Sequence, residues 1–162
     1  MKTIDQPMTT PLVAAEGSGS PANVSARRQA FRTLHEEGCF VIPNPWDVGS
    51  ARYLQHLGFP ALATTSAGFA FSQGLPDSEV ALSRDRNLTY IADIAAAVAV
   101  PVNADFATGY GRAPQDVADN VSRCIATGVA GLSIEDATGD PSSPLYDLPL
   151  AVKRGYHMHY RA

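Results

Sequence analysis

The sequence predicts an α/β protein in which helices cover a parallel sheet. Short apolar runs alternate along the chain with segments whose apolar residues recur at helical spacing. A glycine separates helix from strand at Gly38, Gly58 and Gly128, where it can end the helix. Strands that are apolar on both faces and separated by amphipathic helices are typical of a parallel sheet with helices outside it. Periodicity alone does not separate an open sheet from a closed barrel.

The helices and strands are expected in regular order from Ser25 onward. Ser25 can cap a first helix that carries Phe31 and Leu34 on one face, and Ser83 can cap the third. The expected order is a helix from Ser25, a strand at 39–42, a helix at 48–57, a strand at 61–65, a connection at 66–82, a helix from Ser83, a strand at 101–106, a helix from Pro114, a strand at 130–134 and the beginning of a helix at 148–154.

Composition argues against several classes of partner. The formal net charge is −4 and the chain has no basic run, which disfavours nucleic acid and anionic membrane surfaces. No stretch approaches the roughly 20 apolar residues that a membrane span needs. Cys39 and Cys124 fall within expected elements, which indicates reduced thiols in a cytoplasmic protein. Residues 1–24, rich in Thr, Ser, Pro, Gly and Ala, are expected to form a flexible leader.

Acidic residues follow the expected strands or lie in the loops after them. These residues are Asp47, Asp77, Asp105 and Glu135. Because parallel strands place their carboxyl ends at one rim, these side chains are expected to converge there. Asp47 also suits a helix cap, whereas Asp105 precedes a glycine-bounded loop and fits that role poorly. Several carboxylates at one rim repel each other unless a cation lies between them, and oxygen ligands favour magnesium or manganese.

Five segments, occurring in order, together resemble the isocitrate lyase / phosphoenolpyruvate mutase superfamily. The resemblance covers about residues 26–154. It implies a (β/α)8 barrel of which only the first four β/α units are present, with the half-barrel spanning 25–154. The segments are Asn-Pro-Trp-Asp-Val-Gly-Ser-Ala at 44–51, Thr-Ser-Ala-Gly at 65–68, Gly-Leu-Pro-Asp at 74–77, Asn-Ala-Asp at 103–105 with Thr-Gly-Tyr-Gly at 108–111, and Gly-Leu-Ser-Ile-Glu-Asp at 131–136.

The resemblance also implies a metal site built from three acids. Asp105 is expected to ligate Mg²⁺ directly, and Mn²⁺ is the alternative ion. Asp77 and Glu135 are expected to hold the water shell of the metal. The ligand is expected to be a small α-oxo or hydroxy acid, whose enolate the metal stabilises during cleavage of a carbon–carbon bond.

The same resemblance implies a substrate site beside the metal. The turn formed by Ser66, Ala67 and Gly68 is expected to offer hydroxyl and backbone N–H groups to the substrate carboxylate. Trp46 is expected to line the pocket, and Asp105 to meet the substrate at the metal. No catalytic acid or base is assigned from the sequence.

Two departures from the family pattern narrow the expected activity. Many relatives have a second acid where this chain has Ala107, which removes one outer acceptor of the metal site. Residues 137–147 lack the Lys-x-Cys-Gly-His loop of the lyases and the Asn-rich, Arg-containing loop of the mutases. Cys124 lies in a helical pattern and is interpreted as a packing residue. The sequence therefore resembles the decarboxylase-like or unassigned branch, in place of isocitrate or methylisocitrate lyases or the mutases.

The length suggests a truncated member of the family. A complete barrel needs about 200 residues or more, and residues 155–162 read as an aberrant tail after the amphipathic pattern ends. We therefore expect a Mg²⁺-dependent enzyme of the lyase or decarboxylase type that has little activity alone. The alternative is a non-catalytic half-barrel that self-associates or binds a full-length relative. A nucleotide-binding open sheet is a weaker third hypothesis, because no glycine-rich loop follows the first expected strand.

Overall fold

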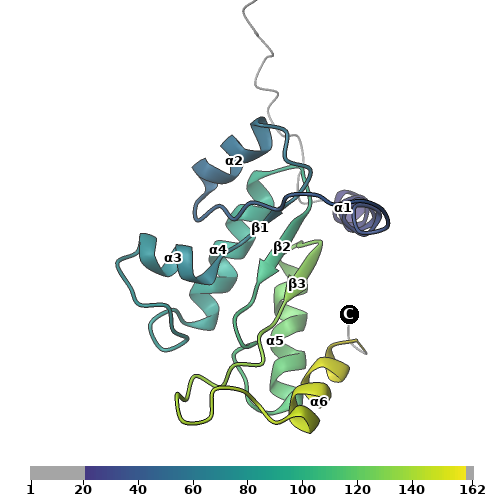
Figure 1. The fold of residues 1–162 in the computed structure, drawn as a ribbon. Coiled ribbons are helices and arrows are strands. Elements are labelled where there is room, and N and C mark those ends of the chain that lie inside the picture. Colours follow the sequence, from purple (N-terminus) through teal and green to yellow (C-terminus); the bar gives the residue numbers. More distant parts are fainter. Residues whose placement is uncertain (1–20, 160–162) are drawn as a thin grey trace, which may run out of the picture.

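A computed structural model describes residues 21–159 of the chain, and the side chains of residues 23–155. Within this range a three-stranded parallel sheet has the order β1-β2-β3 (Figure 1). Asn103 in the central strand pairs with Ala63 on one side and Gly131 on the other. The strands are β1, Leu62–Ala63; β2, Val102–Asp105; and β3, Gly131–Ser133.

Six helices lie around and beside this sheet in the described range, with α4 and α5 packed against one of its faces. None of these helices has the length and apolar character of a membrane span. Asp47 begins the second helix by accepting a hydrogen bond from Ser50 N at 2.6 Å, and Ser50 Oγ accepts from Asp47 N in return. The helices are α1, Pro21–Thr33; α2, Val48–His56; α3, Ser66–Ser72; α4, Arg84–Ala97; α5, Pro114–Ala126; and α6, Leu148–His159.

The core lies between the sheet and helices α4 and α5 (Figure 1). Alternate residues of β2 and its continuation point to these helices and are fully buried. They pack against the apolar faces that the helical spacing predicted. The central members are Val102, Ala104 and Phe106 from the strand, Ile91 and Ile94 from α4, and Val117 and Val121 from α5.

Two arginines attach α1 to the end of the molecule where β3 begins. Arg27 is buried and donates to Ala95 O at 2.7 Å, in the last turn of α4. Arg28 donates to Ile125 O and Val129 O, each at 3.1 Å, at the end of α5. Cationic side chains that bind the last carbonyls of a helix satisfy groups that have no partner within the helix. Helix α1 therefore closes the ends of two other helices.

The structure corrects the predicted count of four β/α units. Residues 39–42 form no strand, so three predicted strands are present in the described range, shortened to their central residues. Directly after this segment, Pro43 O accepts one hydrogen bond of the ladder type from Ala63 N at 3.0 Å. The segment lies at the edge of the sheet, where no described strand pairs with its other side. Three helices also differ from the prediction. Helix α1 begins at Pro21, so Ser25 lies inside it and does not cap it; residues 1–20 of the expected leader lie outside the described residues. Helix α3 lies within the expected connection at 66–82, and α6 continues to His159, into the expected aberrant tail.

Candidate acidic site at the carboxyl end of the sheet

A cavity of about 440 Å³ lies at the carboxyl end of the strands. It is lined by the first residue of α3 and by three loops, which follow α3, β2 and β3. No Lys, Arg or His is among its lining residues in the described part of the chain. Its chemically active side chains are those of Ser66, Asp77, Ser78, Glu79, Thr108, Tyr110, Glu135 and Thr138.

Asp105 ends β2 beside this cavity and is held by the first turn of α3. Its Oδ2 accepts hydrogen bonds from Ser66 N at 2.7 Å and from Ser66 Oγ at 2.8 Å. Its Oδ1 accepts from Ala107 N at 3.1 Å, and its own N–H donates to Thr64 Oγ1 at 2.9 Å. Both carboxylate oxygens are thus fixed in direction. The Ser66 donors that were expected to meet a substrate carboxylate bind the Asp105 carboxylate in this structure.

Glu79 is a member of the cavity that sequence reasoning missed. Its Oε1 accepts from the backbone N–H of Thr108 at 2.9 Å and from the Thr108 hydroxyl at 2.5 Å. This interaction joins the loop after α3 to the loop after β2. The available signal was the spacing of Asp77 and Glu79, two acids separated by one serine in the same loop.

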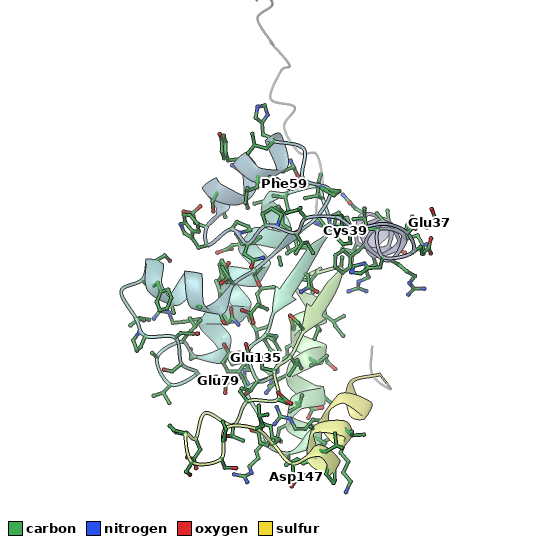
Figure 2. All side chains as sticks on the ribbon, in the orientation of Figure 1. Glu37, Cys39, Phe59, Glu79, Glu135 and Asp147 are labelled. Carbon is green, nitrogen blue, oxygen red and sulfur yellow. The ribbon has the colours of Figure 1, made fainter. Side chains whose placement is uncertain are left out.

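The carboxylates influence one another across the cavity. Burial raises the pKa of Glu135, and the negative charges of Asp105, Asp77 and Glu79 raise it further. Burial likewise raises the pKa of Tyr110, with smaller contributions from the same three acids. Figure 2 shows Glu79 and Glu135 at the same end of the sheet, whereas Glu37 lies at the other end. The cavity is therefore a region of concentrated negative charge.

The loop after β2 is held in an unusual backbone conformation. Ala107 has φ 46° and Tyr110 has φ 53°, in the left-handed region that residues other than glycine seldom adopt. Asn120 stabilises this loop by donating to Gly109 O at 3.0 Å and to Tyr110 O at 2.9 Å. Arg154 of α6 is buried and donates to the carbonyls of Gly111, at 2.7 Å, and Thr108. Such strain persists where surrounding contacts over-determine the backbone, which is common at functional sites.

The acids suit a metal held mainly through water. Among the described residues, no three His, Cys, Asp or Glu side chains lie close enough together to hold an ion directly. Mg²⁺ commonly keeps several of its waters and binds only one or two carboxylates. Asp105 as the direct ligand, with Asp77 and Glu135 acting through water, fits this donor set, because their mutual repulsion is what a cation relieves.

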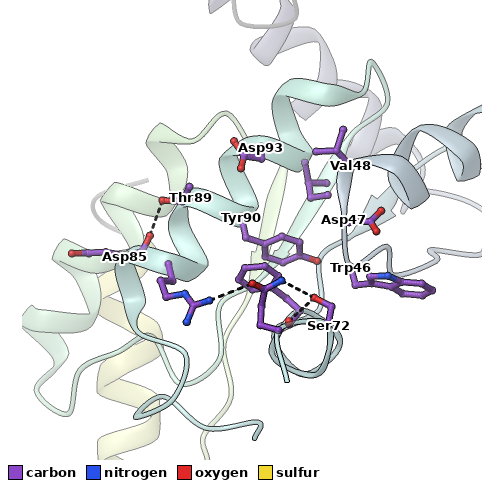
Figure 3. A pocket seen from close by; sticks show the side chains of 12 residues that line it. Trp46, Asp47, Val48, Ser72, Asp85, Thr89, Tyr90 and Asp93 are labelled. Atoms are coloured by element: carbon purple, nitrogen blue, oxygen red, sulfur yellow. Dashed lines mark hydrogen bonds between the residues drawn. The ribbon is translucent and has the colours of Figure 1, made fainter. Parts of the chain in front are cut away.

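The remaining predicted substrate residues lie apart from the cavity lining. Trp46 is 51% exposed and lines a larger cavity, of about 790 Å³, among α2, α3 and α4 (Figure 3). Gly68 N donates to Thr65 Oγ1 at 3.0 Å, where it caps α3. Neither Ala67 nor Gly68 is among the residues that line the acidic cavity. The structure therefore brings Ser66, Asp77 and Glu135 together around Asp105, and places Trp46 elsewhere.

Tyr90 lines the larger cavity and holds the residue that precedes Ser66. Its hydroxyl donates to Pro45 O at 2.6 Å and accepts from Thr65 N at 3.2 Å, and its ring stacks on Phe69. Tyr90 and Trp46 both line the larger cavity (Figure 3). Burial raises the pKa of Tyr90 to about 12, so this hydroxyl remains a donor at neutral pH. It fixes the residue that precedes Ser66.

Cys124 packs in the core, as the helical pattern predicted. It is fully buried in α5, and burial raises the pKa of its thiol to about 12. The thiolate is the reactive form of cysteine. This side chain therefore contributes packing and no nucleophile at neutral pH.

The chain is similar to a family of enzymes that act on small organic acids. The family model of phosphoenolpyruvate phosphomutase matches residues 31–161. One solved structure that the chain resembles comes from Burkholderia cenocepacia, and lyase or mutase activity is attributed to that protein. The two chains are 46% identical and superpose with a TM-score of 0.83. The aligned region covers 87% of this chain and 50% of the Burkholderia chain.

Two further solved structures share the fold. A 2,3-dimethylmalate lyase of the phosphoenolpyruvate mutase/isocitrate lyase superfamily is 29% identical with a TM-score of 0.73, covering 86% of this chain and 48% of its own. A phosphonopyruvate hydrolase is 22% identical with a TM-score of 0.79, and the aligned region covers 84% of this chain and 48% of the hydrolase chain. The chain thus spans about half the length of these relatives. The match of the family model over most of the chain places this protein in the phosphoenolpyruvate mutase/isocitrate lyase superfamily, whose members include mutases, lyases and hydrolases.

Proposed function

We propose that this chain carries the metal-binding side of a site that acts on a small α-oxo or hydroxy acid through an enolate. The reaction class is cleavage of a carbon–carbon bond, of the lyase or decarboxylase type, in the cytoplasm. One observation carries the proposal. Carboxylates from the loops after α3 and β3 line one cavity beside Asp105, and no basic side chain lines it with them in the described range.

The residues that line the cavity and those beside it have distinct parts in this proposal. Asp105 ligates Mg²⁺ (or Mn²⁺), and Asp77 and Glu135 accept hydrogen bonds from its water. Mg²⁺ bound there supplies positive charge for a developing enolate oxygen. Ser66 presents its N–H and hydroxyl at the same place, and these groups reach a substrate carboxylate only when Asp105 releases them. Tyr90 keeps the turn that carries Ser66 in position.

The choice of probe follows from the same chemistry. Oxalate imitates the planar, doubly charged enolate of an α-oxo acid. The structure of the phosphonopyruvate hydrolase contains oxalate and Mg²⁺. Because this chain spans about half of that protein, its own substrate and turnover are part of the proposal. We expect binding of metal and oxalate, with little turnover by the chain alone.

The test is a thermal melt of the chain with Mg²⁺ and oxalate, separately and together. A ligand at about one hundred times its dissociation constant adds roughly 2.7 kcal/mol to the free energy of unfolding. In a chain of this size we expect the melting temperature to rise by about 5–11 °C. Asp105→Asn should abolish the rise, and Glu37→Gln, at the opposite end of the molecule, should keep it. A wild-type melting temperature that is indifferent to both additives would reject the proposal.

A second candidate function is a half-barrel module that binds a second copy or a longer relative. It is favoured by the edge of β3 that pairs with no strand among the described residues. It is also favoured by three exposed apolar side chains on and before α6, those of Leu145, Leu148 and Val152. Sedimentation of the purified chain distinguishes this candidate. A monomer at all concentrations, alone and mixed with the relative, would reject it.

A further inference from the structure

We propose that Glu79 is a fourth carboxylate of the metal site, oriented for that role by Thr108. The inference rests on the proposed function and extends it to a residue that the motifs did not identify. Ala107 brings only a methyl group to this side of the cavity. Glu79 reaches the adjacent residue from another loop and brings a charge to the same wall.

The hydrogen bonds of Glu79 leave one oxygen free for a ligand. Thr108 donates twice to Oε1, through its N–H at 2.9 Å and its hydroxyl at 2.5 Å. Within the described residues, Oε2 accepts no hydrogen bond that competes with a ligand. A carboxylate with one fixed and one available oxygen is suited to accept from a metal-bound water. Thr108 is therefore a positioning residue and Glu79 the acceptor.

A purely structural role does not account for the charge of Glu79. A glutamine at this position could accept the same two hydrogen bonds from Thr108 through its carbonyl oxygen. The carboxylate instead adds a negative charge to a cavity that Asp77 and Glu135 also line. Such an arrangement opposes folding unless a cation enters. The unfavourable charge is explained if the cavity holds a cation when the protein functions.

Glu79→Gln is the test, because it keeps the shape and the acceptor while removing the charge. Binding of Mn²⁺ to the full chain is followed by electron paramagnetic resonance, and binding of Mg²⁺ by calorimetry, without any assay of turnover. We expect the dissociation constant to rise by about 10–100-fold, the usual effect of losing an outer partner of a metal site. Without metal, the melting temperature should stay the same or rise, since a repulsion is removed.

Three companion variants make the result specific. Glu37→Gln removes the same charge from an exposed position at the other end of the molecule and should leave the affinity unchanged (Figure 2). Thr108→Val keeps the backbone donor and loses the hydroxyl, so the affinity should fall less than in Glu79→Gln. Ala107→Asp in the Glu79→Gln background returns a carboxylate to the same wall and should recover part of the affinity.

The outcomes separate this inference from the proposed function. If wild-type chain binds Mn²⁺ and Glu79→Gln binds it equally well, Glu79 is no part of the site while the proposed function stands. If the wild-type chain binds neither metal, the proposed function fails and the role of Glu79 fails with it. Reduced metal binding in Glu79→Gln, with a metal-free melting temperature that is unchanged or raised, supports the inference.

Discussion

Helix α1 is expected to stabilise the fold chiefly through Arg27. Arg27 is 6% exposed, and its guanidinium donates to Ala95 O at 2.7 Å, Val98 O at 3.3 Å and Gly128 O at 3.4 Å. These carbonyls stand at or beyond the ends of α4 and α5, where no intrahelical donor remains. Arg27→Met keeps the apolar stem and removes the donors, so the change tests the hydrogen bonds themselves.

The magnitude follows from opposing contributions. A hydrogen bond to a charged group contributes about 1.5–3 kcal/mol, and the bond to Ala95 O has the short distance of a strong one. Against this, burial and the charge of Arg28 lower the pKa of Arg27, so the buried charge itself is unfavourable. The hydrogen bond to Ala95 O therefore contributes its full free energy, while the two longer hydrogen bonds offset the cost of burying the charge. The expected loss is about 2 kcal/mol.

The assay is urea unfolding followed by circular dichroism, with Arg32→Met as the matched control. Arg32 lies on the same helix and is exposed, so its replacement should change the free energy of unfolding by no more than about 0.5 kcal/mol. The Arg27 variant should lose about 2 kcal/mol with an unchanged slope. Equal stability of the two variants would refute the role assigned to Arg27 and leave α1 as a loosely attached segment.

Two further predictions concern the site. Tyr90→Phe removes the hydroxyl that joins Pro45 O to Thr65 N. This change should lower the free energy of unfolding by about 1–2 kcal/mol and weaken oxalate binding. Unchanged values of both would show that the turn at Ser66 needs no such support. The folded chain holds the proton of Glu135 more tightly than the unfolded chain, so stability should fall as pH rises from the ordinary glutamate pKa through the raised one. Glu135→Gln should flatten this part of the pH profile of urea unfolding, and an unaltered profile would assign the dependence to another group.

The core and the strand positions could be predicted because they depend on local pattern. The three observed strands lie within predicted runs, and Val117 and Val121, spaced by one helical turn in α5, are both buried. The run at 39–42 has the same composition, but composition does not reveal whether a partner strand is available on both sides. Pairing is a property of the sheet, and the first run lies at its edge.

The site was partly predictable for a different reason. A residue directly after a parallel strand is brought to one rim by topology, which is why Asp105 and Glu135 could be located from sequence. Glu79 lies in a longer loop, and its position is set by Thr108, 29 residues away. Trp46 also follows an expected strand, yet the direction of its side chain depends on packing with α3 and α4. The left-handed backbone at Ala107 has no sequence signal, because alanine seldom adopts it.

Thr108 joins the acidic cavity to the last helix. Its N–H and hydroxyl bind Glu79, and its carbonyl accepts from Arg154, whose guanidinium lies 4.0 Å above the ring of Tyr146. A shift of α6 would therefore move the loop that carries Ala107 and the donors that orient Glu79. In the other direction, a cation that draws Glu79 inward would act through Thr108 on Arg154. Arg154 forms no ion pair with a carboxylate in the described chain, so its charge is committed to these carbonyls and to this ring. The segment from Tyr146 to Arg154 is consequently part of what shapes the acidic site, although it contributes no side chain to the cavity itself.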